Sequence, residues 1–165
     1  MKKRFAAVLT SLLLLMLLVP AAAFATGGHT VNEDLNLKNG TTLADDGYTW
    51  DASTNTLTMQ DLTVMGNINL PNAECTINVK GNCSVKTIQG GLDAVTLTVK
   101  GEDGAVFQGE IEVNGPLVFE DLTMTDGMIS NQTVNFQSIL SLHNSNITLH
   151  HLSWMPDGGI DLVGS

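Results

Sequence analysis

Thr56-Leu57-Thr58-Met59 is the stretch that decides the fold, because it returns in altered form at intervals of 20 residues. The later copies are Thr76-Ile77-Asn78-Val79, Thr96-Leu97-Thr98-Val99 and Pro116-Leu117-Val118-Phe119. In every copy the second and fourth residues are apolar and most of their neighbours are polar, which is the alternation of a β-strand with one buried face. Strands that repeat at this spacing are typical of a β-solenoid, in which successive coils stack around a common core.

Two further strands are expected in each coil, joined at corners formed by Gly and Asp, which tolerate the left-handed backbone of a sharp turn. The repeat therefore predicts an all-β chain, a single-stranded parallel β-helix of about five coils with about 20 residues per coil. The corner after the first strand is predicted at Asp61, Gly81, Gly101 and Asp121. The second strands are predicted at Leu62/Val64, Cys83/Val85, Ala105/Phe107 and Leu122/Met124, and the third at Ile68/Leu70, Ile88/Leu92, Ile111/Val113 and Val134/Phe136.

The repeat also predicts which side chains meet inside and outside the solenoid. Outside, Lys100 and Glu120 share a column on consecutive coils and are expected to form an ion pair, with Lys80 above Lys100. Inside, one continuous aliphatic stack is expected from Leu57, Ile77, Leu97 and Leu117.

Residues 1–25 have the pattern of a signal peptide. Lys2, Lys3 and Arg4 are followed by an apolar stretch and by Ala23-Phe24-Ala25, a small-x-small cleavage site. A retained membrane anchor is the alternative. Residues 26–50 are then expected to cap the first coil, and residues 51–165 to form the β-helix repeat domain. The chain is expected to be secreted or extracellular, without a membrane partner after cleavage.

The charge balance argues against nucleic acid and anionic membranes as partners. The chain has 7 basic and 17 acidic residues, and three of the basic ones lie in the predicted signal peptide. The mature chain therefore has a net charge of 4 − 17 = −13, and it retains no arginine. Such a surface repels polyanions and favours solubility.

The two cysteines leave two interpretations open. Cys75 and Cys83 could form a disulfide in an exported protein, provided that the compartment is oxidising. Alternatively, Cys83 alternates with Val85 on the inward face and acts as a small buried apolar residue.

The segment Tyr48-Thr49-Trp50-Asp51 through Thr56-Leu57-Thr58-Met59 resembles the opening of a known group of modules. These are the β-helix repeat domains of secreted and surface proteins from gut and other Gram-positive bacteria, some of which are described as carbohydrate-binding. The resemblance covers about residues 45–130. It implies a right-handed, pectate-lyase-like parallel β-helix and a location at a bacterial surface.

Enzymes with this fold act on polysaccharides, and the chain lacks the groups that such reactions need. A lyase commonly uses an arginine as its base, and a hydrolase needs two carboxylates roughly 5 to 9.5 Å apart. Asp61 and Asp121 share a corner line but lie three coils apart, roughly 14 Å at the strand spacing. No catalytic residue is therefore assigned, and no cofactor is expected.

Neither a metal site nor an ice-binding face is favoured. His143, His150 and His151 are close in sequence, but alternation places them on different strands or faces. Outward threonines on three successive coils are similar to the flat ladders of ice-binding solenoids, yet threonine is also a good strand former on any solvated face.

The sequence therefore favours a non-catalytic module with a structural, display or adhesive role at a bacterial cell surface. The alternative is a carbohydrate-binding module that recognises extracellular glycans. Its ring-stacking candidates are Tyr48, Trp50 and Trp154, although Tyr48 and Trp50 also suit a lid over the first coil. A polysaccharide lyase or hydrolase and an ice-binding protein are two further alternatives.

The period changes after Gly127, and the last residues resemble a coil that has only begun. The next strand pairs are Leu140/Leu142 and Ile147/Leu149, and residues 152–165 hold Trp154, Ile160, Leu162 and Val163. We expect either a truncated repeat protein or a final coil that pairs with another molecule, so the expected partners are extracellular glycans or further repeats.

Overall fold

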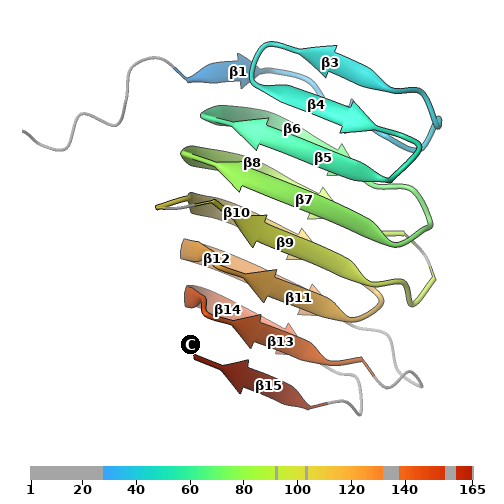
Figure 1. The fold of residues 1–165 in the computed structure, drawn as a ribbon. Coiled ribbons are helices and arrows are strands. Elements are labelled where there is room, and N and C mark those ends of the chain that lie inside the picture. Colours follow the sequence, from blue (N-terminus) through green and yellow to red (C-terminus); the bar gives the residue numbers. More distant parts are fainter. Residues whose placement is uncertain (1–27, 92, 103, 132–137, 155–158, 165) are drawn as a thin grey trace, which may run out of the picture.

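A computed structural model describes residues 28–91, 93–102, 104–131, 138–154 and 159–164. These residues form two sheets of stacked strands that face each other across a common interior (Figure 1). The chain makes about four turns of roughly 22 residues each, and it contains no helix in the described part. Seen from the first coil, each turn runs clockwise as the chain advances, so the solenoid is right-handed (Figure 1). The predicted fold class is confirmed, with a somewhat longer repeat and about four turns where about five coils were expected.

From Thr56 onward the strands alternate between the two sheets along the chain. Sheet A contains β1 (His29–Val31), β2 (Leu35–Asn36), β6 (Leu62–Asn69), β8 (Asn82–Gln89), β10 (Val106–Glu112), β12 (Thr123–Asn131) and β14 (Asn146–Trp154). Sheet B contains β3 (Leu43–Asp45), β4 (Tyr48–Asp51), β5 (Thr56–Gln60), β7 (Cys75–Lys80), β9 (Leu97–Gly101), β11 (Leu117–Glu120), β13 (Leu140–His143) and β15 (Ile160–Val163).

Each coil has two strands and not the three that the sequence predicted. The expected second and third strands form one long strand of sheet A, bent at a β-bulge where the register shifts. At the bulge of β10, Gly109 has φ of 141°, and a Cβ there would lie 2.3 Å from the Val85 carbonyl oxygen. A bulge bends a strand without ending its pairing. It therefore turns the chain where a corner between the second and third strands was predicted.

The pairing of β7 with β9 differs from the predicted register by two residues. Ile77 lies beside Val99, and Leu97 lies beside Cys75. A shift of two residues keeps every side chain on its original face, so the alternation of the sequence does not distinguish the two registers. The predicted stack is therefore wrong at this step. The interior columns of sheet B are Leu57, Ile77, Val99, Phe119 and Leu142, and beside them Cys75, Leu97, Leu117 and Leu140.

The same shift moves one predicted corner. Asp61, Gly81 and Asp121 have φ values of 45°, 64° and 52°, as expected for the turn between the sheets. Gly101 instead pairs with Val79 at the end of β9, and the left-handed backbone of that coil occurs at Gly104, with φ of 74°. The third coil therefore has a longer connection at this corner.

Two of the predicted third-strand positions lie outside the described residues. These are Leu92 and the pair Val134/Phe136. In the fourth coil the described inward positions beyond the bulge are Ile129 and Asn131, both of which have no exposed surface. Asn131 is held in the interior by a hydrogen bond from its Nδ2 to the Gly115 carbonyl oxygen at 2.9 Å.

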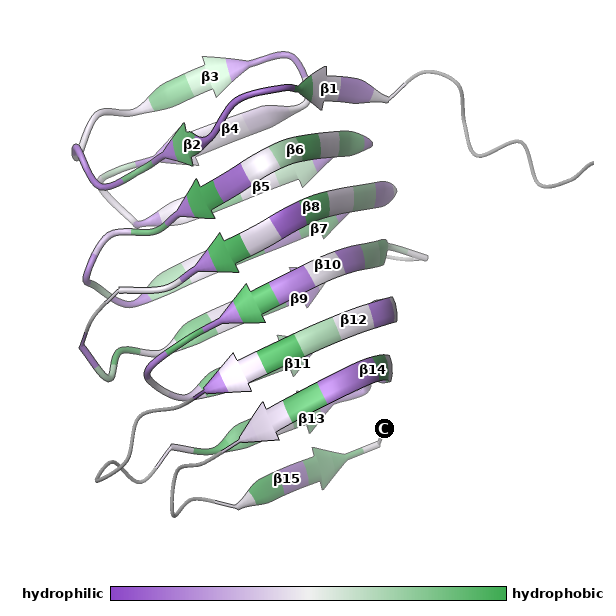
Figure 2. Ribbon diagram, turned by 180° about the vertical axis from the view of Figure 1, so that it is seen from behind, coloured by the Kyte–Doolittle hydropathy of each residue, from purple (hydrophilic) through white to green (hydrophobic). Residues whose placement is uncertain are grey.

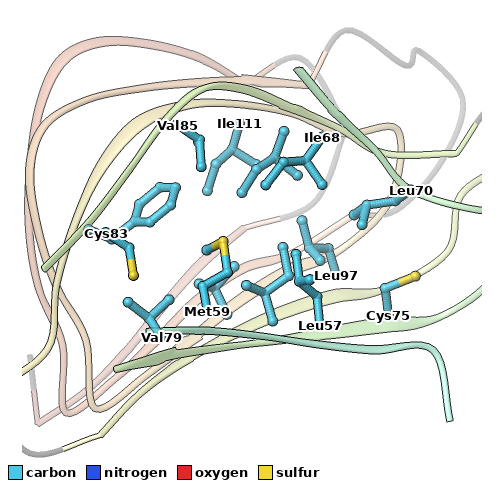
Figure 3. Close-up of a cluster of buried hydrophobic side chains, with 14 of the residues drawn as sticks. Leu57, Met59, Ile68, Leu70, Cys75, Val79, Cys83, Val85, Leu97 and Ile111 are labelled. Carbon is cyan, nitrogen blue, oxygen red and sulfur yellow. The ribbon is translucent and has the colours of Figure 1, made fainter. Parts of the chain in front are cut away.

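The interior is filled with aliphatic, aromatic and sulfur-containing side chains from both sheets (Figure 3). Apolar and polar residues alternate along the strands of sheet A (Figure 2). The two cysteines belong to this core as free thiols, and their side chains lie at opposite sides of the cluster in Figure 3. The structure therefore favours the small buried residue over the disulfide.

An antiparallel hairpin closes the N-terminal end of sheet B. β3 pairs with β4, and β4 pairs with β5, both antiparallel, whereas the strands that follow are parallel. Trp50 lies opposite Leu57 and covers the first coil. Among the residues described, no helix is long and apolar enough to cross a membrane.

The packing predicts a large difference between two adjacent residues of β9. Leu97 has Cys75 on one side and Leu117 on the other and is 3% exposed, so Leu97→Ala should lower the free energy of unfolding by about 2 to 5 kcal/mol. Thr98 points outward, and Thr98→Ala should change it by no more than about 0.5 kcal/mol. Urea unfolding of both variants is the measurement. Equal losses would place Leu97 on the wrong face.

Candidate functional surfaces

The outer face of sheet B carries two polar columns. Thr56, Thr76 and Thr98 lie side by side on successive strands, and Val118 ends this column. The second column is Thr58, Asn78, Lys100, Glu120 and His143. The threonines thus form one column of three and not the double ladder of a flat ice-binding face.

Two ion pairs join the coils of sheet B. Lys100 Nζ lies 2.6 Å from Glu120 Oε2, which confirms the predicted pair. Lys80 was expected to lie above Lys100, but its Nζ lies 2.8 Å from Glu102 Oε1. The register shift explains this correction, because it places Lys80 beyond the end of β9. All four side chains are substantially exposed, and such pairs contribute about 0 to 1 kcal/mol each.

Polar side chains also join neighbouring strands on the outer face of sheet A. Most of these bonds run from one coil to the next, so the polar groups of this face bind one another. Thr87 Oγ1 donates to Glu110 Oε2 at 3.1 Å, Gln89 Nε2 to Glu112 Oε2 at 3.3 Å, Gln108 Nε2 to Thr125 Oγ1 at 3.0 Å, and Ser84 Oγ to Thr63 Oγ1 at 3.2 Å.

The corners carry a third set of links between coils. The carboxylates of Asp34, Asp61 and Asp121 each accept a hydrogen bond from a residue in the next coil. The donors are the backbone N–H of Asn67 at 2.7 Å, the backbone N–H of Asn82 at 3.0 Å and the side-chain amide of Asn144 at 2.6 Å. Asn72 and Asp93 are joined reciprocally: Asn72 Nδ2 donates to the Asp93 carboxylate, and the Asp93 backbone N–H donates to Asn72 Oδ1 at 2.7 Å. Asp61 and Asp121 thus hold corners together on coils three steps apart.

Two shallow hollows open on the surface, and polar groups line both. The first, of about 370 Å³, lies beside the threonine column and includes Ser53, Asn55, Glu74, Thr76 and Thr98. The second, of about 410 Å³, lies at the edge of sheet A and includes Lys38, Gln89, Glu112, Asn114 and Ser130. Neither lining includes an aromatic ring.

The three predicted ring residues do not form one sugar-stacking platform. Trp50 is 1% exposed and belongs to the core, so its indole covers the first coil and leaves no face open for a sugar. Tyr48 is half-buried on the same strand; burial raises the pKa of its phenol, and the Asp45 carboxylate raises it further. Trp154 lies partly buried at the end of β14, beside Asn131. β4 and β14 lie near opposite ends of the solenoid (Figure 1).

The three histidines considered as metal ligands are spread over two strands of the last coil. His143 lies on β13 beside Glu120, whereas His150 and His151 lie on β14. His150 Nδ1 is 3.1 Å from Asp126 Oδ1 in an exposed pair. Within the described ranges, no group of three or more His, Cys, Asp or Glu side chains gathers where it could hold a metal ion.

The C-terminal end of the solenoid is its most apolar surface. β14 and β15 are the outermost strands of the two sheets at this end. Four of their large apolar residues are well exposed, and we call these the end surface: Leu152 at 41%, Ile160 at 54%, Leu162 at 62% and Val163 at 56%. The apolar residues of this end could be read from the sequence, whereas the network of links between coils could not, because that network depends on register.

Comparison with models of protein families, with characterised proteins and with solved structures finds no match to this chain.

The burial of Cys75 predicts a loss of stability at alkaline pH. Burial raises the pKa of its thiol from an ordinary value of 9.0 to about 11. Above pH 9.0 the unfolded chain loses the proton that the folded chain keeps, so the free energy of unfolding should fall as the pH rises toward 11. Urea unfolding on both sides of pH 9.0 should show a steeper decline for the wild type than for Cys75→Ala. Parallel declines would contradict the prediction.

Proposed function

We propose that this chain is a secreted, non-catalytic β-solenoid with a structural, display or adhesive role at a bacterial cell surface. One observation carries the proposal: side-chain links join each coil to the next from β5 and β6 to β13 and β14. They comprise ion pairs on sheet B, hydrogen bonds on sheet A and Asx contacts at the corners.

Through these links, the polar side chains hold neighbouring coils together. In a catalytic groove, carboxylates face the substrate and stand at a fixed separation from each other. Here Glu110 and Glu112 accept hydrogen bonds from Thr87 and Gln89, and Asp61 and Asp121 join corners. Polar groups used in this way support a stiff spacer that holds its ends at a set distance.

The location rests on three sequence features. The signal-peptide pattern of residues 1–25 supports export, and the net charge of −13 after cleavage supports solubility outside a cell. The resemblance of residues 48–59 to Gram-positive β-helix repeat modules supports a surface location. The expected role is therefore that of a repeat module in a larger surface assembly.

The end surface supplies the joining point of such an assembly. It combines exposed Leu162, Ile160 and Val163 with the free edges of two strands. An apolar edge of this kind favours pairing with another strand. The other end of sheet B is covered by the hairpin of β3 and β4. We therefore assign the end surface to a β-solenoid coil of the same type as the ones described.

The distribution of charge favours association through the end surface over association through the rest of the molecule. Of the 17 acidic residues, only Asp157 and Asp161 follow Asp126 in the sequence. Two copies of so acidic a chain repel each other over most of their surface, and the repulsion is weakest where carboxylates are few. The last coil is that region.

Glycan binding is the second candidate, and one hollow favours it. The hollow beside the threonine column offers the hydroxyls of Ser53, Thr76 and Thr98 together with the amide of Asn55 and the carboxylate of Glu74. Hydroxyls, amides and carboxylates suit the hydrogen bonding of sugars. The hollow lacks a ring for stacking, which is why we rank glycan binding second.

A glycan array and a polysaccharide degradation assay on the full chain separate the candidates. We expect no saturable binding and no degradation. Saturable binding that Thr98→Ala abolishes would move the function to the hollow, provided that the variant unfolds like the wild type. Binding abolished by Trp154→Ala or Tyr48→Ala, again with the fold intact, would restore the ring-stacking alternative.

The end surface makes a separate prediction about association. The chain without residues 1–25 should associate as its concentration rises, and Leu162→Lys should return it to a monomer, because a charge on a strand edge opposes pairing. Met65→Lys is a matched control, since Met65 is 60% exposed and lies on the outer face of sheet A. Light scattering after size-exclusion chromatography is the measurement. A wild type that stays monomeric at high concentration, or equal effects of both variants, would overturn the assignment.

A further inference from the structure

The connection between β2 and β3 contains an Asn-Gly pair whose surroundings favour a chemical reaction. Asn39 and Gly40 are both exposed, and Gly40 has φ of 65° with no atom within 4 Å of the position that a Cβ would occupy. We propose that Asn39 is a site of spontaneous intramolecular deamidation. This inference is independent of the proposed surface role.

The reaction needs only the chain and water. The backbone nitrogen of Gly40 loses its proton to solvent and attacks Cγ of Asn39, so a new C–N bond closes a five-membered succinimide. The side-chain nitrogen takes up a proton from solvent, its bond to Cγ breaks, and it leaves as ammonia. Water then opens the ring at one of its two carbonyls and produces aspartate or isoaspartate. No atom is oxidised or reduced.

The local geometry leaves both reacting groups accessible. Gly40 has no Cβ that would obstruct the attack on the neighbouring side chain. Within the described part of the chain, no hydrogen bond engages the Asn39 side-chain amide or the Gly40 N–H. The hydrogen bond from Lys38 N to Asn36 Oδ1, at 3.1 Å, lies just before the reacting pair in the sequence and does not involve either reacting group.

A second Asn-Gly pair supplies an internal comparison. The side-chain Nδ2 of Asn114 donates to the Gly91 carbonyl oxygen at 3.0 Å, so its amide is held against the previous coil. A Cβ on Gly115 would lie 2.3 Å from the Val95 carbonyl oxygen, which shows that the backbone is packed there. Ring closure at Asn114 therefore requires the coils to open locally, whereas ring closure at Asn39 does not.

The product changes the surface without entering the core. Deamidation places a carboxylate next to Lys38, one of four basic residues outside the predicted signal peptide. The isoaspartate form also lengthens the backbone of the connection by one methylene. Leu37, two residues earlier, is 1% exposed and stays in the interior, and Leu43 packs against the core two residues beyond Thr41. These two contacts confine the change to the connection.

The test is to incubate the full folded chain in mildly alkaline buffer and to follow each Asn-Gly pair by peptide mass mapping and isoaspartate detection. We expect conversion at Asn39 to be at least about tenfold faster than at Asn114, because only Asn114 needs local opening. Asn39→Gln should abolish the fast reaction, and Asn114→Gln should leave it unchanged.

The unfolded chain provides the decisive control. In concentrated urea the chain is unfolded and neither Asn-Gly pair is held by neighbouring coils, so the two deamidation rates should become similar. Equal rates at the two sites in the folded chain would overturn the proposal, as would conversion of Asn39 that occurs only after unfolding. Persistence of the fast reaction in Asn39→Gln would assign it to another residue and would overturn the proposal as well.

Discussion

The structure depends on one constraint: each coil must place an apolar side chain directly beside one from the coil before it. Leu57, Ile77, Val99 and Phe119 meet this requirement in one column, and none of them has exposed surface. Because strands alternate strictly between two faces, the same backbone then presents its intervening residues to solvent in equally regular columns. The hydroxyl column, the ion pairs and the hydrogen-bonded amides of the outer faces are consequences of that interior stacking.

Alternation and spacing were enough to predict the fold class, and they were not enough to predict register. The period of two identifies which face a residue occupies, so Leu97 and Thr98 were placed correctly inside and outside. It is insensitive to a slip of two residues, and β9 is displaced by that amount relative to β7. The predicted corner at Gly101 and the contact between Lys80 and Lys100 both failed for this reason. The bulge of β10 was missed because a strand that bends and a strand that ends have the same composition around Gly109.

The surfaces were less predictable than the fold because their properties depend on contacts between coils. Trp50 in isolation suits a sugar-stacking ring and a core residue equally well, and only the antiparallel pairing of β4 with β5 places it over Leu57. Likewise, the sequence shows Asp61 only as an acidic residue at a turn. Its role as a link between coils depends on the next coil, where Asn82 N lies 3.0 Å from the Asp61 carboxylate. The Lys100–Glu120 pair could be predicted, because the spacing between β9 and β11 is regular.

A polar side chain on the outside of a solenoid can either bond to the next coil or bind a ligand. A side chain that is already bonded to the next coil must break that bond before it can bind a ligand. On sheet A, Thr87, Gln89 and Gln108 already donate to neighbouring strands, so a ligand there must replace formed bonds. The free energy gained from the new hydrogen bond is then about equal to that lost with the old one, since each such bond contributes only about 0.5 to 1.5 kcal/mol net. On sheet B, Thr76 and Thr98 line a hollow that is open to solvent, whereas Lys100 and Glu120 of the neighbouring column pair with each other. Sheet B therefore combines links between coils with polar groups that face solvent, and a ligand at the hollow would have fewer formed bonds to replace.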